Sequence, residues 1–91
     1  MTDFSLTEAA ISDLSQISRY TIERWGKRQA GAYINEIFET FAMLAKFPAL
    51  APIADEYFEG RVFYHLHHFI VFREAENRIE ILRIVHERMR R

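Results

Sequence analysis

The residues of this chain best suited to contact an anion are the arginines of its last third. Residues 60–91 contain seven arginines, no lysine and four glutamates, a net charge of +3, whereas residues 1–59 carry a net charge of −4. A guanidinium group can hold a carboxylate or a phosphate through two parallel hydrogen bonds. The last third therefore favours an anionic partner, either acidic side chains or nucleic acid, although an ordinary mixed surface would explain the same composition.

Arg83 is the most informative of these arginines, because it interrupts an apolar run at residues 81–85 that is otherwise typical of a buried strand. An unpaired buried guanidinium is very costly, so Arg83 must either form an ion pair or face solvent. Strict alternation along the strand would place it on one face with Ile79, Ile81 and Val85.

Two interpretations of Arg83 follow. In the first, it pairs across the open sheet face with Glu80, Glu74 or an acid in a loop. In the second, it joins Arg61 and Arg73 in an anion-binding surface on the sheet face without helices. Structural ion pairs are common in folded proteins, so the first interpretation is preferred.

The histidines offer a weaker indication of chemistry. His65, His67 and His68 lie close together, and on a strand the first two would project to the same side. The sequence offers no evident third ligand for a metal, so a turn or strand-end cluster is the better interpretation. His86 could exchange a proton near neutral pH. The sequence also lacks cysteine, a glycine-rich phosphate loop and the common hydrolase motifs, so we expect a binding protein without metal or cofactor rather than an enzyme.

Sequence periodicity predicts two helices that would position these side chains. Residues 3–6 alternate polar and apolar as in a short strand, and Thr7 offers an N-cap for a helix that begins at residue 7 or 8. Gly26 ends this helix, since glycine tolerates the left-handed backbone conformation. A second apolar stripe with helical spacing begins at Ala30 and stops before the Phe-Pro pair at 47–48. The short joint between them predicts a hairpin of antiparallel helices.

The remaining third predicts strands. Aromatic and β-branched residues dominate 61–64, 68–73 and 78–85, and a short polar turn occupies 74–77. These strands form an antiparallel meander that the N-terminal strand joins as a fourth, with the helical hairpin over one face. The predicted architecture is therefore β-α-α-β-β-β, an α+β two-layer sandwich on a small antiparallel sheet.

Length and composition limit this architecture to a single domain. The chain has 91 residues, of which 49% are hydrophobic, so residues 1–91 can build one modest core. The apolar runs are too short for a membrane-spanning helix, and the first residues lack the pattern of a signal peptide. We therefore expect a cytoplasmic protein.

The ordered set of apolar and charged positions resembles the ParE toxins of the RelE/ParE superfamily, which are the toxic partners of bacterial type II toxin–antitoxin modules. The resemblance spans residues 5–89 and rests on the following positions: the run 6–14, Ile17, Tyr20, Trp25, Gly26, Ala30, Tyr33, the Phe-Pro pair at 47–48, Arg61, and the runs 68–73 and 79–86. It implies a toxin that inhibits DNA gyrase by stabilising its cleaved-DNA complex, without chemistry of its own.

The resemblance also implies partners and surfaces. A ParD-like antitoxin would neutralise the toxin in a hetero-oligomeric complex and bind operator DNA through its ribbon-helix-helix end. The residues expected to line the antitoxin groove are Leu14, Ile17, Tyr20, Trp25, Tyr33 and Ile37. The residues expected to face gyrase or another anionic partner are Arg61, Arg73, Arg83, Arg88 and Arg90.

Two alternatives stay open within the same superfamily. A RelE-like, ribosome-dependent mRNA endonuclease would use Arg61, Arg83 and His86 around the scissile phosphate. An inactive relative would keep only antitoxin binding. Two departures from the usual ParE pattern also stand out: residues 66–67 are Leu-His where many relatives have a glycine, which predicts a longer or bulged hairpin, and the chain ends in a basic segment at 88–91.

Overall fold

The computed structural model describes residues 3–53 and 60–87. Its elements, in chain order, are β1 (Asp3–Leu6), α1 (Glu8–Trp25), α2 (Lys27–Lys46), a short 3-10 helix η1 (Pro48–Leu50), β2 (Arg61–His65), β3 (His68–Ala75) and β4 (Arg78–His86). The predicted β-α-α-β-β-β order and the α+β fold class are confirmed.

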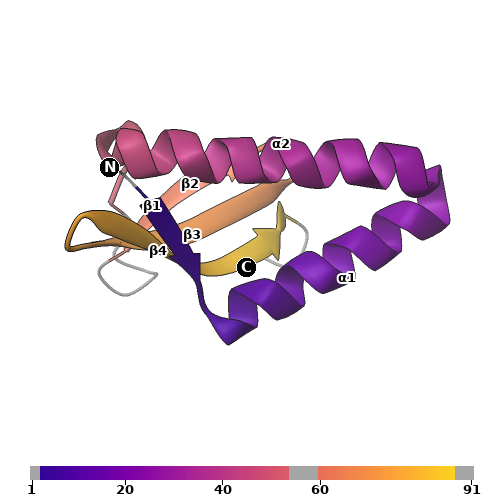
Figure 1. The fold of residues 1–91 in the computed structure, drawn as a ribbon, viewed down its shortest axis with the longest axis horizontal. Helices are drawn as coiled ribbons and strands as arrows, with labels where there is room; N and C mark the ends of the chain where they lie inside the picture. Colours follow the sequence, from indigo (N-terminus) through magenta and orange to yellow (C-terminus); the bar gives the residue numbers. More distant parts are fainter. Residues whose placement is uncertain (1–2, 54–59, 88–91) are drawn as a thin grey trace.

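Local signals fix both ends of α1. The Thr7 hydroxyl accepts a hydrogen bond from the Ala10 amide at 3.1 Å, which is the N-cap that the sequence predicts. At the other end Gly26 adopts a φ of +91°, a conformation that strains any residue with a Cβ atom. The chain then enters α2 at once, so that the two helices form a tight hairpin (Figure 1). Neither these helices nor any other helix in the described residues is long and apolar enough to cross a membrane.

The four strands form one sheet in the order β1-β4-β3-β2. β2, β3 and β4 pair as the predicted antiparallel meander, whereas β1 pairs in parallel with β4 along residues 78–81. The sheet is therefore mixed rather than wholly antiparallel. A parallel partner at this position requires a crossover, and the two helices provide it.

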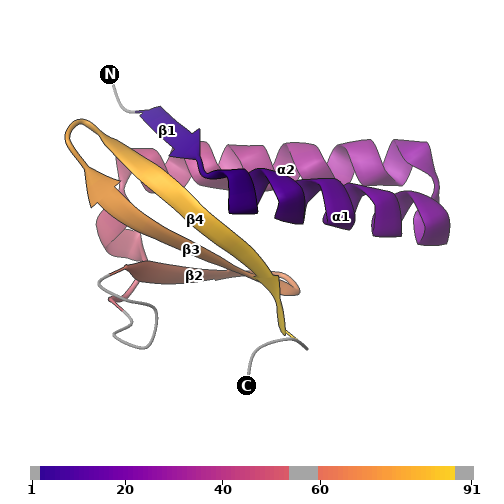
Figure 2. The same ribbon diagram turned by 90° about the horizontal axis from the view of Figure 1, so that it is seen from below.

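The helical hairpin covers one face of the sheet, as Figure 2 shows from below. Apolar side chains from both layers meet between them in a single core. Its largest fully buried members are Phe41, Phe72, Ile37, Leu44, Ile70, Ile79 and Ile81. Most of the helical members come from the second half of α2, so this half holds the hairpin on the sheet.

A β-bulge in β4 changes which side chains reach this core. Phe72 lies opposite Ile81, while its neighbour Val71 lies opposite Arg83, so Leu82 has no partner in β3. Ile81 is fully buried beneath the helices, whereas Arg83 turns to the opposite face. The prediction that Ile81 and Arg83 share a face is wrong, because strict alternation cannot continue through a bulge.

The outer part of the helical hairpin projects beyond the sheet in both views (Figures 1 and 2). We call residues 19–28, which end α1 and begin α2, the hairpin tip. Three large apolar side chains of the tip are exposed, Tyr20, Ile22 and Trp25, and Trp25 retains 64% of its accessible surface. The tip is thus the part of the described chain farthest from the support of the core.

The turn between β2 and β3 contains only Leu66 and His67. The expected longer or bulged hairpin is therefore not found. Leu66 instead adopts a φ of +55°, a left-handed conformation that a glycine would adopt without strain. The polar turn predicted at 74–77 is also shorter, because β3 continues to Ala75 and only residues 76–77 remain as the turn.

Candidate functional site

Arg61 begins β2 on the helix-facing side of the sheet. It lies directly opposite Phe72, and residues opposite each other in an antiparallel pair share a face. Its Nε donates to the Glu74 carboxylate at 2.9 Å, and its Nη1 donates to the Ala51 carbonyl at 2.6 Å. Arg61 is therefore an edge residue that binds the end of the chain segment after α2, and it does not lie on the open sheet face as predicted.

Arg73 lies on the open face, as the sequence predicts. Glu80 is directly opposite it on β4, and the Arg73 Nε donates to the Glu80 carboxylate at 2.7 Å. The arginine side chain is 62% exposed, so the pair is in contact with solvent. An ion pair this exposed contributes little to stability and can rearrange toward another anion.

Arg83 pairs with Asp13 of α1, an acid that neither interpretation of the sequence considered. Its Nε and Nη2 donate to the two oxygens of the Asp13 carboxylate at 2.8 and 3.0 Å. The Ile84 backbone amide donates to the same carboxylate at 2.9 Å. β4 extends here past the end of β1, so Asp13 accepts a strand-edge hydrogen bond that a further strand would otherwise take. The hydrogen bonds to Asp13 raise the pKa of Arg83.

These positions correct the predicted anion-binding surface. Arg61 lies on one face of the sheet and Arg73 and Arg83 on the other, and a carboxylate pairs with each of the three. Arg88 and Arg90, the other members predicted for this surface, lie outside the described residues. The arrangement resolves Arg83 in favour of an ion pair, with a different partner from those expected.

The trio proposed for the endonuclease alternative is not gathered into one site. His86 lies opposite His68, which is buried beneath α2, so His86 also faces the helices. Arg83 points away from that face, and Arg61 lies two strands away on β2. Phosphate cleavage needs cationic and proton-transfer groups around one reacting centre, and these three side chains do not converge.

Histidines occupy the end of the sheet where β2 turns into β3. The Tyr33 hydroxyl lies 2.6 Å from Nδ1 of His68, and Thr40 Oγ1 lies 3.2 Å from Nδ1 of His65, so α2 contacts both rings. Burial lowers the pKa of His68 to about 4 and raises the pKa of Tyr33 to about 12. Both groups are therefore neutral near pH 7, and their hydrogen bond makes this end of the sheet a structural contact with α2.

His67 lies apart from His65, although the sequence pattern suggested that the two project together. His67 is in the turn, where its Nδ1 lies 3.0 Å from the Glu87 carboxylate. Tyr64 donates to the same carboxylate at 2.6 Å, and these hydrogen bonds lower the pKa of Glu87. Within the described residues no three histidine or acidic side chains are placed to hold a metal ion.

The inner residues predicted for an antitoxin groove belong largely to the core. Ile37 is fully buried in the core, so its assignment to a groove is wrong because it offers no surface to a partner. Leu14, Ile17 and Tyr33 are half-buried and pack against the core with part of their surface open. The exposed parts of these three side chains can form the floor of a docking surface.

The hairpin tip holds functional candidates that charge counting by thirds of the chain did not reveal. Tyr20 and Trp25, two predicted groove residues, are exposed there. Four basic side chains share the same short segment: Arg19, Arg24, Lys27 and Arg28. None of these four forms an ion pair with another residue in the part of the chain that the structure describes. A shorter window over residues 19–28, with four basic residues against Glu23 alone, would have shown the cluster.

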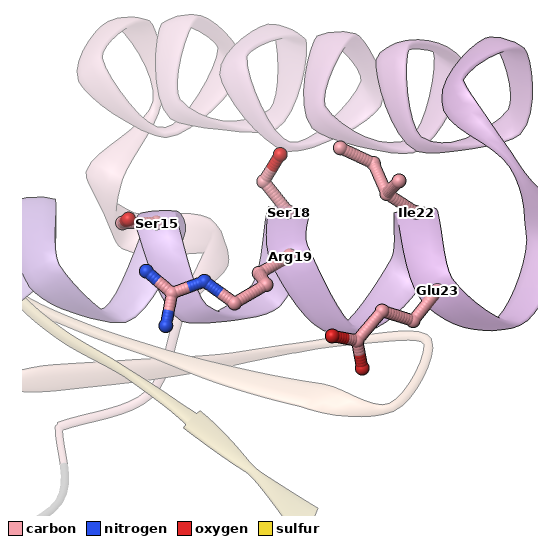
Figure 3. A pocket seen from close by; sticks show the side chains of 5 residues that line it. All are labelled: Ser15, Ser18, Arg19, Ile22 and Glu23. Carbon is pink, nitrogen blue, oxygen red and sulfur yellow. The ribbon is translucent and has the colours of Figure 1, made fainter.

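A shallow hollow lies along α1 where the tip begins. Ser15, Ser18, Arg19, Ile22 and Glu23 line it. Ser18 and Ile22 point toward α2, whereas Arg19 and Glu23 point to the other side of α1 (Figure 3). The hollow thus combines one apolar side chain with polar groups of both signs, which suits a protein surface better than a small molecule.

The fold defines the class of protein first. A chain described as "Chromosomal ParDE TA system from P. aeruginosa" has the same fold with a TM-score of 0.80, covering 94% of this chain and 96% of that chain at 24% identity. At this identity the likeness establishes the fold alone: two helices on a four-stranded mixed sheet.

The sequence then identifies the family. Residues 4–91 match the family described as ParE toxin of type II toxin-antitoxin system, parDE. Toxin ParE1 of Caulobacter vibrioides is 30% identical to this chain over 89 residues, which cover 98% of this chain and 93% of the relative. The chain belongs to the ParE toxin family, and the resemblance found in the sequence is confirmed.

Proposed function

We propose that this chain acts in the bacterial cytoplasm as a toxin that inhibits DNA gyrase by stabilising the cleaved-DNA complex of the enzyme. The observation that carries the proposal is the membership of the ParE family along residues 4–91. A ParD-like antitoxin neutralises the toxin in a hetero-oligomeric complex, and its ribbon-helix-helix end gives that complex its affinity for operator DNA.

Inhibition by docking, without catalysis, agrees with the placement of the charged groups. The endonuclease alternative needs Arg61, Arg83 and His86 around one phosphate, but they lie on different faces or strands. Arg61 and Arg83 are each held by a carboxylate as well. An enzyme of that class would have to break both ion pairs and reposition all three side chains before it could act.

The antitoxin docks along the helical hairpin in this proposal. Leu14 and Ile17 supply a half-buried apolar floor on α1, and Tyr20 and Trp25 extend it with exposed aromatic surface. An amphipathic helix of the antitoxin can lay its apolar face on such a surface, which is a common mode of peptide recognition. Aromatic residues are the usual anchors of such interfaces.

Gyrase contacts the open sheet face in this proposal. Arg73 and Arg83 are more than half exposed there and carry donors that a carboxylate or phosphate of the complex can share. Arg88 and Arg90, which the sequence also predicts for this surface, lie outside the described residues. Arg73 is the best residue to test because its ion pair with Glu80 is exposed, so its loss should leave the fold intact.

The test is a cleavage assay with purified gyrase and supercoiled plasmid. Wild-type toxin is expected to accumulate linear, protein-linked DNA, and the antitoxin encoded beside it is expected to abolish this product. Arg73→Gln should reduce the product severalfold. Lys46→Gln removes an exposed cation at the end of α2, in the helix layer and not on the open sheet face, and it should behave as wild type.

A parallel assay with translating ribosomes separates the alternatives. Cleaved mRNA together with unaffected gyrase would overturn the proposal in favour of the endonuclease. Antitoxin binding without either activity would overturn it in favour of an inactive relative. Equal loss of gyrase product in Arg73→Gln and Lys46→Gln would refute the assigned surface while leaving gyrase as the target.

A further inference from the structure

The hairpin tip is a positive pole on a chain that is acidic overall. Residues 19–28 carry a net charge of +3, whereas the whole chain carries −1. No acid of the described residues pairs with the four basic side chains of the tip. The tip also projects away from the sheet (Figures 1 and 2). A polyanion that approaches along the hairpin axis therefore meets the positive electrostatic field of the tip first.

The start of α2 opposes the preference of its own helix dipole. A helix N-terminus favours acidic residues and an oxygen-bearing cap, because its first amides carry partial positive charge. α1 follows this rule with Thr7 as cap and Glu8 in its first turn. α2 has Gly26 without a side-chain cap hydrogen bond, no acid in its first turn, and Lys27 and Arg28 in place of one. This arrangement is unfavourable for the free helix, and a bound anion would relieve it.

Aromatic side chains accompany these cations. Trp25 and Tyr20 are both more than half exposed, and the Arg24 guanidinium lies 5.5 Å from the centre of the Tyr20 ring. A cation–π contact of this kind leaves the charge of the arginine unneutralised. The tip therefore presents charged and aromatic groups on a narrow, preformed helical end.

We propose that the hairpin tip binds the phosphate backbone of duplex DNA through Arg19, Arg24, Lys27 and Arg28. This inference goes beyond the proposed function, because it assigns a DNA contact to the toxin itself and needs no gyrase surface. An antitoxin that covers Tyr20 and Trp25 would also cover these cations, so DNA contact and neutralisation would exclude each other.

Duplex DNA fits the tip better than an acidic protein segment does. The cations are spread over the ends of two helices, and the hollow that Arg19 lines is open and of mixed polarity. A contact with a phosphate depends on the charge and the length of the basic side chain more than on a fixed pairing geometry. A regular row of phosphates can therefore meet all four side chains.

The experiment uses the intact wild-type protein and a short duplex, in the absence of gyrase and antitoxin. Trp25 is the only tryptophan, so its fluorescence reports on the tip directly. Anisotropy of a labelled duplex gives the affinity between about 50 and about 200 mM salt. We expect binding that quenches Trp25 and weakens steeply as salt increases.

The variants locate the contact. Lys27→Gln with Arg28→Gln should weaken binding about tenfold at low salt and reduce the slope of log affinity against log salt by about 2. Lys46→Gln with Arg78→Gln removes the same charge outside the tip and should change binding less than twofold. Circular dichroism should show that both double variants remain folded.

Three results would overturn the inference: no duplex-dependent change of Trp25 fluorescence, equal losses in the two double variants, or binding of poly-glutamate as tight as that of DNA. Gyrase inhibition without DNA binding by the free toxin would refute this inference and leave the proposed function standing. DNA binding through the tip by a toxin that leaves gyrase unaffected would do the opposite.

Discussion

The positive side chains of this toxin fall into two groups with opposite surroundings. The described arginines of the sheet that were expected to read an anion, Arg61, Arg73 and Arg83, each pair with a carboxylate. The four basic side chains of the hairpin tip pair with no acid of the described residues, although the first 59 residues are acidic as a whole. The comparison shows that net charge along the sequence does not locate the cations that lack an acidic partner, because folding pairs the sheet arginines with carboxylates and leaves the cations of the tip without them.

The two regions also differ in how their charges affect stability. In the sheet, Asp13 accepts hydrogen bonds from a guanidinium and from a strand-edge amide, so it joins α1 to β4. At the tip, Lys27 and Arg28 lie at the positive end of a helix dipole and oppose it. We therefore expect changes in the sheet to lower stability, and changes at the tip to lower binding with little effect on stability or a small gain.

The largest expected effect is an acid-induced loss of stability at the histidine end of the sheet. Burial lowers the pKa of His68 to about 4 from a normal value of 6.5, so the unfolded chain binds this proton more readily between those values. The contribution of neutral His68 to the free energy of unfolding should therefore be fully present above pH 6.5 and decrease as the pH falls toward 4. Urea unfolding should show up to about 3 kcal/mol of loss from this group across that range.

A variant without this proton site is the control. His68→Gln should lower stability near pH 7, because it disturbs the contact with Tyr33, but its stability should depend less on pH between 6.5 and 4. NMR titration of the His68 ring in the wild-type protein tests the same point without a mutation. A pKa near 6.5 for this ring would contradict the prediction.

The next effect concerns the link between α1 and β4. Asp13→Ala leaves the Ile84 amide without its acceptor and the Arg83 guanidinium without its partner, and the Asp13 side chain is only 11% exposed. We expect the free energy of unfolding to fall by about 2 to 3 kcal/mol, as for other lost hydrogen bonds to charged groups. Chemical denaturation measures it.

Glu80→Gln provides the comparison within the sheet. It weakens the exposed ion pair with Arg73, and we expect it to lower stability by less than about 0.5 kcal/mol. If Asp13→Ala is as mild as Glu80→Gln, the link between α1 and β4 does not have the structural role assigned to it here.

The sequence was sufficient to predict those features that depend on neighbouring residues. Thr7 as N-cap and Gly26 as helix end both act within a few positions, and the structure confirms them. The pairing of Asp13 with Arg83 joins residues 70 positions apart, so no local pattern could indicate it. The bulge at Leu82 was equally hidden, because it depends on how β3 and β4 align.

The candidate site shows the same limit in another form. Tyr20 and Trp25 of α1 were predicted to line the antitoxin groove and are exposed. Ile37 of α2 was predicted for the same groove from the same kind of helical pattern, but it is buried. Periodicity defines the apolar stripe of a helix but not where the sheet beneath it ends. The basic side chains of the tip gain their importance from the same fact, since they lie where the hairpin extends past the sheet.

A smaller effect is expected at the turn between β2 and β3. Leu66 adopts a φ of +55°, which costs a residue with a Cβ atom about 1 kcal/mol or more. Leu66→Gly should therefore raise the free energy of unfolding by about 0.5 kcal/mol, since the greater freedom of glycine in the unfolded chain offsets part of the relief. Asn77 has a similar φ of +62°, but asparagine tolerates it, so Asn77→Gly should give no gain. A loss of stability in Leu66→Gly would show that packing of the leucine outweighs the strain.

The smallest effect gives the sharpest contrast between the two regions, because it predicts a gain in stability with a loss of binding. Lys27 is the first residue of α2 and Lys46 the last, so the same substitution at each meets opposite ends of one helix dipole. Lys27→Glu should raise the free energy of unfolding by about 0.5 kcal/mol, and Lys46→Glu should lower it by about 0.5 kcal/mol. Thermal unfolding at low salt compares the two, and high salt should reduce both shifts. The Lys27 variant should nevertheless lose most of its DNA binding, whereas the Lys46 variant should keep it. If Lys27→Glu were instead destabilising, the lysine would have a structural role, and the tip would not differ from the sheet in the way proposed.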